Sequence, residues 1–266
     1  MKTISCICFV VLMAACAKNS ITGRNQLALL SESQLQEMAT QEYRTFLSEN
    51  KVVSPGSRDG EMVRRVGQRL VSAIKSYYSQ KGLTEDLQGF NWEFNLVENK
   101  EANAWAMPGG KVAVYTGLLP ITQNEAALAV VLGHEIAHAL AKHGNERMSQ
   151  AMVAQGIGVA GEVLTSNNER VNSIFSNVYG PAASIGVLLP NSRKQELEAD
   201  KYGLIFTAMA GYNPQEAIPL WERMQAQAGG NRPPEFLSTH PSEENRIEKL
   251  KQLMPEALKY YKPIGR

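Results

Sequence analysis

The sequence of 266 residues has little cysteine, little net charge and no long apolar run, and each shortage excludes a class of protein. All three cysteines fall within the first sixteen residues, so the body cannot depend on disulfides. The formal net charge of +1 argues against the basic surface that nucleic-acid binding needs. With 44% hydrophobic and 20% charged residues, the chain has the composition of a globular protein with one substantial domain or two small ones.

The first sixteen residues have the composition of a cleaved leader. Met1 and Lys2 form a short positive start, and residues 4–15 are uncharged and mostly apolar. At about 1.5 Å per helical residue this stretch is too short to cross a bilayer, which takes about 20 residues. It therefore predicts a signal peptide over residues 1–15. Residues 12–16, Leu-Met-Ala-Ala-Cys, resemble a bacterial lipobox, in which the leader is cut before a cysteine that becomes lipidated.

Cys16 is therefore the expected site of a lipid anchor, which would hold the domain at a membrane without a spanning helix. The alternatives are an uncleaved anchor and a plain signal peptide whose cysteine is coincidental. Residues 19–25 are polar and include Gly23, so residues 16–30 are expected to form a tether. The folded domain is expected over residues 31–266.

Most of that domain has helical hydrophobic spacing. Helices are expected from Ser31 or Ser33 to about Ser48, and over residues 60–78. Residues 171–192 carry no charge but are too polar and too broken by proline for a transmembrane helix. They are expected either to form a lid near an active cleft or to pack in the core.

Between the helices, the pattern changes to that of strands. Residues 90–96 alternate apolar and polar side chains, and residues 103–106 and 111–115 flank a glycine-rich turn. These segments predict a small antiparallel sheet directly before a helix. The fold class is therefore α+β and mostly helical.

An exposed edge of this sheet could bind extended polypeptide through backbone hydrogen bonds. The candidate edge residues are Asn103, Ala104 and Trp105. The alternative is that the hairpin only packs against the following helix.

The following helix carries the main candidate for chemistry. Residues 126–133 are apolar and lead into His134, Glu135 and His138, within a helix expected from Asn124 to about His143. Histidines four apart lie on one helix face and can hold Zn²⁺, while the carboxylate beside them can take a proton from a water on the ion. The alternative is a pair of core histidines satisfied by hydrogen bonds.

Two histidines leave a catalytic zinc site one protein ligand short. His143 lies five residues after His138, off the metal face, and is expected to be structural. Glu196 and Asp200 would share one helix face, with Glu198 turned away. One of the pair could bind the ion and the other could accept the outer N–H of a ligating histidine. An ordinary solvated helix surface is the alternative.

These segments together resemble peptidase family M48, the zinc metallopeptidases that include the CAAX prenyl endopeptidases, HtpX and soluble periplasmic members. The resemblance implies a zincin-like fold, one Zn²⁺ per chain, Glu196 as its third ligand and Asp200 as hydrogen-bond partner of a ligating histidine. It also implies that His240 lies near zinc, either stabilising the oxyanion or closing the open metal position, and that Arg246 is a second oxyanion partner. The residues that carry the resemblance are His134, Glu135, His138, Glu196, Asp200, residues 238–242 and Arg246.

The sequence thus predicts a lipid-anchored zinc endopeptidase of the bacterial envelope, facing the periplasm from the outer membrane. Unlike CAAX prenyl endopeptidases and HtpX, the chain shows no spanning helix after the leader, which favours the soluble branch. Its expected partners are unfolded or misassembled polypeptides, the membrane and the envelope assembly machinery, without nucleic acid. Two rival hypotheses are a chaperone or assembly factor that rarely cuts, and a structural zinc domain with four firm ligands.

Overall fold

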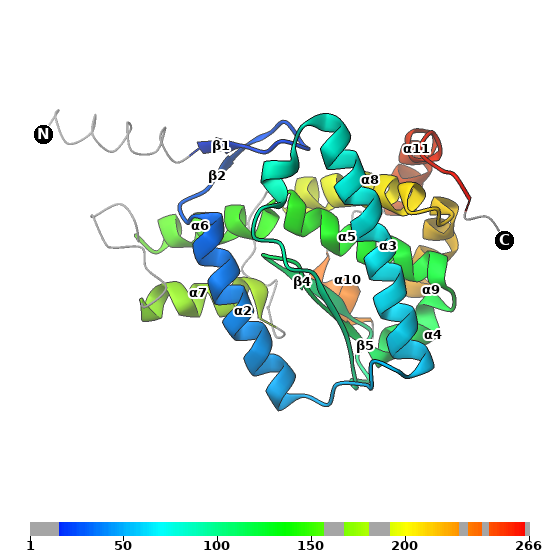
Figure 1. Cartoon of the computed structure of the whole chain (residues 1–266), viewed down its shortest axis with the longest axis horizontal. Helices are drawn as coiled ribbons and strands as arrows, with labels where there is room; N and C mark the ends of the chain where they lie inside the picture. Colours follow the sequence, from blue (N-terminus) through cyan, green and yellow to red (C-terminus); the bar gives the residue numbers. More distant parts are fainter. Residues whose placement is uncertain (1–15, 157–167, 181–191, 229–233, 241–244, 264–266) are drawn as a thin grey trace, which may run out of the picture.

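The computed structural model (Figure 1) describes residues 16–156, 168–180, 192–228, 234–240 and 245–263. Its α-helices are α2 (Glu32–Glu49), α3 (Arg58–Lys81), α4 (Leu119–Thr122), α5 (Glu125–Leu140), α6 (His143–Ala154), α7 (Glu169–Tyr179), α8 (Ser192–Met209), α9 (Ala217–Ala228), α10 (Glu235–Thr239) and α11 (Arg246–Leu258). Its strands are β1 (Cys16–Lys18), β2 (Asn25–Leu27), β3 (Glu93–Val97), β4 (Ala104–Met107) and β5 (Lys111–Tyr115). None of the helices in these ranges combines the length and apolar character needed to cross a bilayer. The mostly helical α+β class is confirmed.

The sheet has strand order β3-β5-β4 and lies between two groups of helices (Figure 1). Along β5, Val112 and Val114 pack into a core formed with α3, α5 and α8, whereas Ala113 and Tyr115 pack into a second core formed with α2, α6 and α7. Every residue of β5 is therefore buried, as expected of a central strand covered on both faces.

One strand pairing differs from the prediction. The hairpin β4–β5 is antiparallel, as expected, but β3 pairs with β5 in parallel, so the sheet is mixed. Alternation of apolar and polar residues indicates which side chains face the core, yet it carries no information on the direction or order of the strands. Placing β5 in the centre leaves β4 at one edge of the sheet.

The segment predicted as a tether is part of the folded domain. β1 and β2 form an antiparallel hairpin that lies against the C-terminal end of α5. The side-chain amides of Asn19 and Gln26 donate to the carbonyl oxygens of Leu140 and Ala141, at 3.2 and 2.8 Å. These carbonyls lack partners within the helix, so the polar residues of the hairpin satisfy them. The polar side chains of this segment therefore bind the end of a helix, and the prediction of a tether is wrong.

The motif helix ends earlier than predicted. It begins where expected, and Asn124 caps α5 by accepting from the backbone N–H of Ala127 at 2.8 Å. The helix stops at Leu140 because Lys142 adopts a left-handed conformation with φ 55°, and α6 then begins at His143. Gly144, expected to end the motif helix, lies inside α6.

Part of the segment considered as a lid is a core helix. Residues 171–179 belong to α7, where Val171, Ile174 and Phe175 are buried in the core beneath α2 and α6. Residues 181–191, and the leader over residues 1–15, lie outside the described ranges. For the described part of this segment, core packing is the better interpretation.

α5 packs most closely against α8, and two glycines allow this approach. A Cβ atom added at Gly133 would lie 2.7 Å from the carbonyl oxygen of Gly203, and one added at Gly203 would lie 2.8 Å from the backbone nitrogen of His134. Both distances are shorter than any ordinary contact, so the two backbones meet without side chains between them. This crossing brings the metal-binding faces of the two helices together.

We expect Gly203→Ala to lower the free energy of unfolding by about 1–3 kcal/mol, the usual effect of forcing extra atoms into a packed interior. Urea denaturation of the two proteins measures it. Gly56→Ala is the control, because the only atom within 4 Å of a Cβ there is the hydroxyl of Ser54, at 4.0 Å. Equal stability of Gly203→Ala and the parent would contradict the close crossing.

Candidate metal centre

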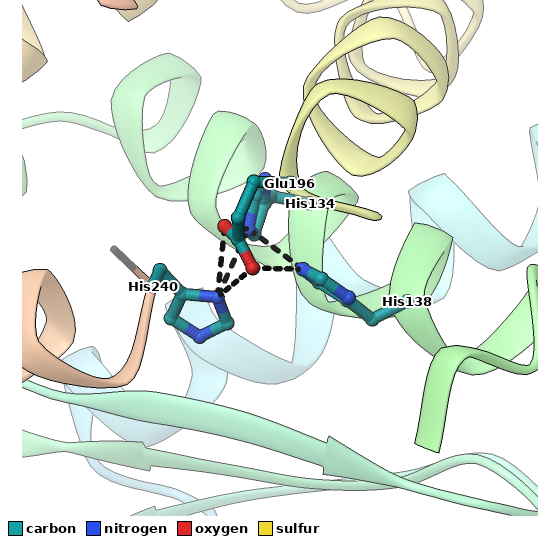
Figure 2. Close-up of side chains that lie close together, drawn as sticks. All are labelled: His134, His138, Glu196 and His240. Atoms are coloured by element: carbon teal, nitrogen blue, oxygen red, sulfur yellow. Dashed lines mark hydrogen bonds and ion pairs between the residues drawn. The ribbon is translucent and has the colours of Figure 1, made fainter. Parts of the chain in front are cut away.

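Four buried side chains from three parts of the chain point toward one another (Figure 2). His134 and His138 come from α5, Glu196 from the facing side of α8, and His240 from the end of α10. Each offers a ligand atom, and all these atoms lie within 4.8 Å of one another. The structure therefore brings together the ligands that the sequence analysis placed on separate segments.

The spacing of these atoms suits a tetrahedral zinc ion. Nε2 of His134 and Nε2 of His138 are 3.0 Å apart, and each lies 3.3 Å from a carboxylate oxygen of Glu196. Ligands held about 2.0–2.1 Å from a tetrahedral ion are separated from each other by about 3.3–3.4 Å. Two imidazoles and one carboxylate are also the ligand types that catalytic zinc takes.

The charge states of these ligands favour a cation. Burial alone would raise the pKa of Glu196, but the surrounding imidazoles outweigh it and hold this pKa well below its usual range. Burial lowers the pKa of His138, which favours the neutral ring that coordinates metal. Burial acts the same way on His134, but its hydrogen bonds to Asp200 and Glu196 raise the pKa to about 9. A metal ion at its Nε2 takes the place of that proton.

Asp200 orients one of the ligands. Its Oδ1 lies 3.0 Å from Nδ1 of His134, so Nδ1 carries the hydrogen and Nε2 faces the ligand group. Asp200 is itself held by Arg246, whose Nη2 donates to the same oxygen at 2.6 Å. The contact between Asp200 and His134 is the one that the family resemblance implies.

Arg246 reaches the site from behind the ligands. Its guanidinium carbon lies 3.8 Å from the centre of the Trp221 ring, and its Nη1 lies 3.6 Å from Oε2 of Glu196. With Nη2 bonded to Asp200, the guanidinium holds two carboxylates in place. Arg246 therefore contacts both carboxylates, and its part as an oxyanion partner stays a prediction.

Glu135 and His240 face each other beside the ligand group. Nε2 of His240 lies 3.2 Å from Oε1 of Glu135, an oxygen that is buried without a hydrogen-bond partner among the described residues. Burial raises the pKa of Glu135, which suits a carboxylate that must accept a proton. Nδ1 of His240 lies 3.2 Å from Nε2 of His134, within the ligand group. The ring of Phe236 stacks on His240 with 4.5 Å between ring centres.

A second set of contacts, which the sequence analysis missed, lies behind His138. Its Nδ1 is 2.9 Å from Nδ1 of His143, and Nε2 of His143 is 3.0 Å from Oε2 of Glu198. Glu198 points away from the metal, as predicted, but it faces Arg24 of the N-terminal hairpin, whose Nε donates at 2.9 Å. Spacing along α8 predicts only that Glu198 faces away from Glu196, and no pattern in the sequence connects it to a segment 174 residues earlier.

The candidate edge residues lie on β4 and have different surroundings. The carbonyl oxygen of Asn103 accepts from Tyr115 at 3.0 Å, so the alternation of an antiparallel pair directs the backbone groups of Ala104 and Ala106 away from β5. The backbone N–H of Phe236 donates to the carbonyl of Ala102 at 3.0 Å, which joins this edge to the helix that carries His240.

Trp105 packs on the other side of β4, away from that helix. Its ring lies 4.9 Å from Phe46 and 5.8 Å from Tyr43, between ring centres. Its side chain therefore belongs to the core under α2, and only its backbone contributes to the strand beside α10.

We expect Asp200→Asn to weaken zinc binding by about 10–100-fold, because the amide cannot fix the orientation and tautomer of His134 as the carboxylate does. Competition with a chelator of known affinity measures the change. Asp59→Asn, on the exposed first turn of α3, is the matched control. Equal zinc affinity for Asp200→Asn and the control would show that Asp200 does not orient the ligand.

The chain matches the family model described as Peptidase family M48 over residues 61–254. Mitochondrial metalloendopeptidase OMA1 of Saccharomyces cerevisiae is 37% identical over 182 residues, which span 66% of this chain and 50% of that protein. Metalloendopeptidase OMA1, mitochondrial, of Homo sapiens is 30% identical over 245 residues, or 90% of this chain and 46% of that protein. Beta-barrel assembly-enhancing protease of Escherichia coli is 29% identical over 198 residues, or 70% and 37%.

The chain thus spans about half the length, or less, of the curated relatives it matches. The shared part is nevertheless the part that carries the ligands, since the family model covers α5, α8 and the end of α10. The matched region covers most of the chain and contains the metal-binding group, which has the ligand types of a catalytic zinc site, so the chain belongs to peptidase family M48.

Proposed function

We propose that the chain is a zinc-dependent endopeptidase of the bacterial cell envelope that cleaves unfolded or misassembled polypeptides. The observation that carries this proposal is the buried set of His134, His138 and Glu196 with the carboxylate of Glu135 beside it. The names of the relatives, which call them metalloendopeptidases or a protease, support the same class of reaction.

In this mechanism the protein side chains position reactants and move one proton. A zinc ion held by His134, His138 and Glu196 would supply a Lewis acid and would make a water beside it more acidic. Glu135 accepts the proton from the attacking water and returns it to the leaving amine. Burial, which raises the pKa of Glu135, makes the protonated form accessible between these two steps. His134 and His138 keep their coordinating nitrogens directed at the ion because Asp200 and His143 contact the opposite ring nitrogens.

The substrate is proposed to bind as an added strand along β4. The outward backbone groups of Ala104 and Ala106 would pair with an extended chain, and this pairing requires no particular side-chain sequence. The side chain of Asn103 already accepts from the N–H of Ala104 at 2.9 Å, so it would move aside as the substrate binds. Recognition through backbone groups suits a protease that acts on unfolded chains.

The envelope location rests on the leader and on Cys16, which lies exposed at the start of β1. A lipid on Cys16 would place the domain on the periplasmic side of the outer membrane. The name of the Escherichia coli relative, Beta-barrel assembly-enhancing protease, favours the envelope assembly machinery as a partner. The relatives named OMA1 are mitochondrial, so the family itself does not determine the compartment.

We also propose that His240 closes the site at rest. Its Nδ1 lies among the ligand atoms and its Nε2 lies at the general base, so one ring covers both the metal position and Glu135. Substrate must then displace His240 before cleavage can begin. This arrangement favours the second candidate function, a chaperone or assembly factor that binds polypeptide and has a latent protease site.

The variant Glu135→Gln separates cleavage from binding. We expect it to keep one zinc per chain, because His134, His138 and Glu196 still hold the ion, and to cleave unfolded casein about 10²–10⁴-fold more slowly. Zinc content and the rate of peptide release are measured on the same preparation. Glu37→Gln, exposed on α2, is the matched control and should cleave at the parent rate. Parent-like turnover by Glu135→Gln would refute the assignment, and binding of casein without cleavage by the parent protein would favour the chaperone.

The variant His240→Ala tests the closed state. We expect its cleavage rate on casein to rise several-fold at unchanged zinc content, because the metal position and Glu135 both become accessible. If His240 instead stabilises the oxyanion, the rate should fall by about 10²–10³-fold. Initial rates at saturating substrate distinguish the two outcomes, and a fall would contradict the closed state.

A further inference from the structure

A continuous line of hydrogen bonds connects the N-terminal hairpin to His138. Arg24, between β1 and β2, donates to Glu198 of α8; Glu198 contacts His143 of α6; and His143 contacts His138. The exposed fractions of the Arg24, Glu198 and His143 side chains are 14%, 16% and 0%, so this line runs mostly through the protein interior. None of these three residues belongs to the ligand group.

The chemistry of the line determines which nitrogen of His138 carries a hydrogen. An ionised carboxylate can only accept, so Nε2 of His143 must be the donor to Glu198. In a neutral imidazole the other nitrogen is then an acceptor, so Nδ1 of His143 accepts from Nδ1–H of His138. That leaves the lone pair of His138 on Nε2, the nitrogen that faces Glu196 and the metal position.

Arg24 holds the carboxylate of Glu198 in the position from which it accepts from His143. Its guanidinium donates to Glu198 through Nε and to both carboxylate oxygens of Glu146, at 2.5 and 2.6 Å. Glu146 also accepts from the amide of Gln195 at 2.7 Å, so it too is held in place. Two carboxylates and one guanidinium therefore form a fixed group, which restricts the rotation of Glu198 and keeps its Oε2 directed at Nε2 of His143.

The backbone explains why His143 can take part. Five residues after His138 on a continuous helix, it would point away from the metal face. The left-handed residue Lys142 interrupts the helix before α6, and His143, the first residue of α6, contacts Nδ1 of His138. The left-handed region is unfavourable for a residue that, like lysine, carries a Cβ atom.

We propose that Arg24 is a positioning residue for the zinc ligand His138, acting through Glu198 and His143. The inference rests on the zinc site within the proposed function, but it does not depend on which substrate is cleaved. It assigns the N-terminal hairpin a part in metal binding, in addition to its contacts with the end of α5.

Zinc affinity of the full chain tests the proposal. We expect Arg24→Met and Glu198→Gln each to weaken zinc binding by about 10–100-fold in chelator competition, the usual effect of losing the partner of a ligating histidine. Arg24→Lys should recover part of the loss, because it restores the charge but not the forked contacts with both carboxylates. The double variant should be no weaker than Glu198→Gln alone, because the two residues act on the same path.

The control is Tyr202→Phe, which removes the hydrogen bond from the Tyr202 hydroxyl to the carbonyl of Ile21 in the same hairpin. It loosens the hairpin without touching Glu198 or His143, and we expect it to bind zinc as the parent does. Melting temperatures of all variants are measured in parallel. Two outcomes would overturn the proposal: parent-like zinc affinity for Arg24→Met, or an equal loss for Tyr202→Phe. A parent protein that binds zinc tightly without cleaving casein would refute the proposed protease and leave this inference standing.

Discussion

The close crossing of α5 and α8 is the constraint on which the rest of the structure depends. Gly133 and Gly203 let the two backbones meet, and the ligands lie within seven residues of this contact on each helix. Without a side chain between the helices, two histidines on one and a carboxylate on the other reach a common point. The remaining elements either support this pair from outside or add groups to its open side. The zinc site is thus a consequence of how two helices pack.

The carboxylates behind the ligating histidines can be buried because each has partners. Asp200 is held between His134 and Arg246, and Glu198 between His143 and Arg24. Behind His134, the hydrogen bonds lead to Asp200 and then to Arg246. Behind His138, they lead through His143 to Glu198 and then to Arg24. The same arrangement appears on both sides of the metal position, although the residues come from unrelated parts of the chain. Isolated charges in such a place would instead lose their charge or destabilise the fold.

The sequence predicted those features that depend on local spacing. Periodicity located the helices and strands, and the positions of His134, His138 and Glu196 on their helices followed from residue spacing and family resemblance. The parallel pairing of β3, the docked hairpin and the role of His143 could not be predicted in this way. Each depends on contacts between distant segments, and His143 depends in addition on a single left-handed residue that no hydrophobic pattern reveals. Polar residues were the main source of error, because composition alone does not distinguish solvation from capping of a helix end.

The docked hairpin would also limit how far a domain anchored at Cys16 could move from a bilayer. Cys16 opens β1, and Asn19, three residues later, is bonded to the end of α5. An extended chain spans at most about 3.3–3.6 Å per residue, so a lipid on Cys16 would leave only about 10 Å of slack. Such a domain would stay beside the membrane and would not diffuse away from it. A domain anchored in this way would meet polypeptides only close to the membrane surface.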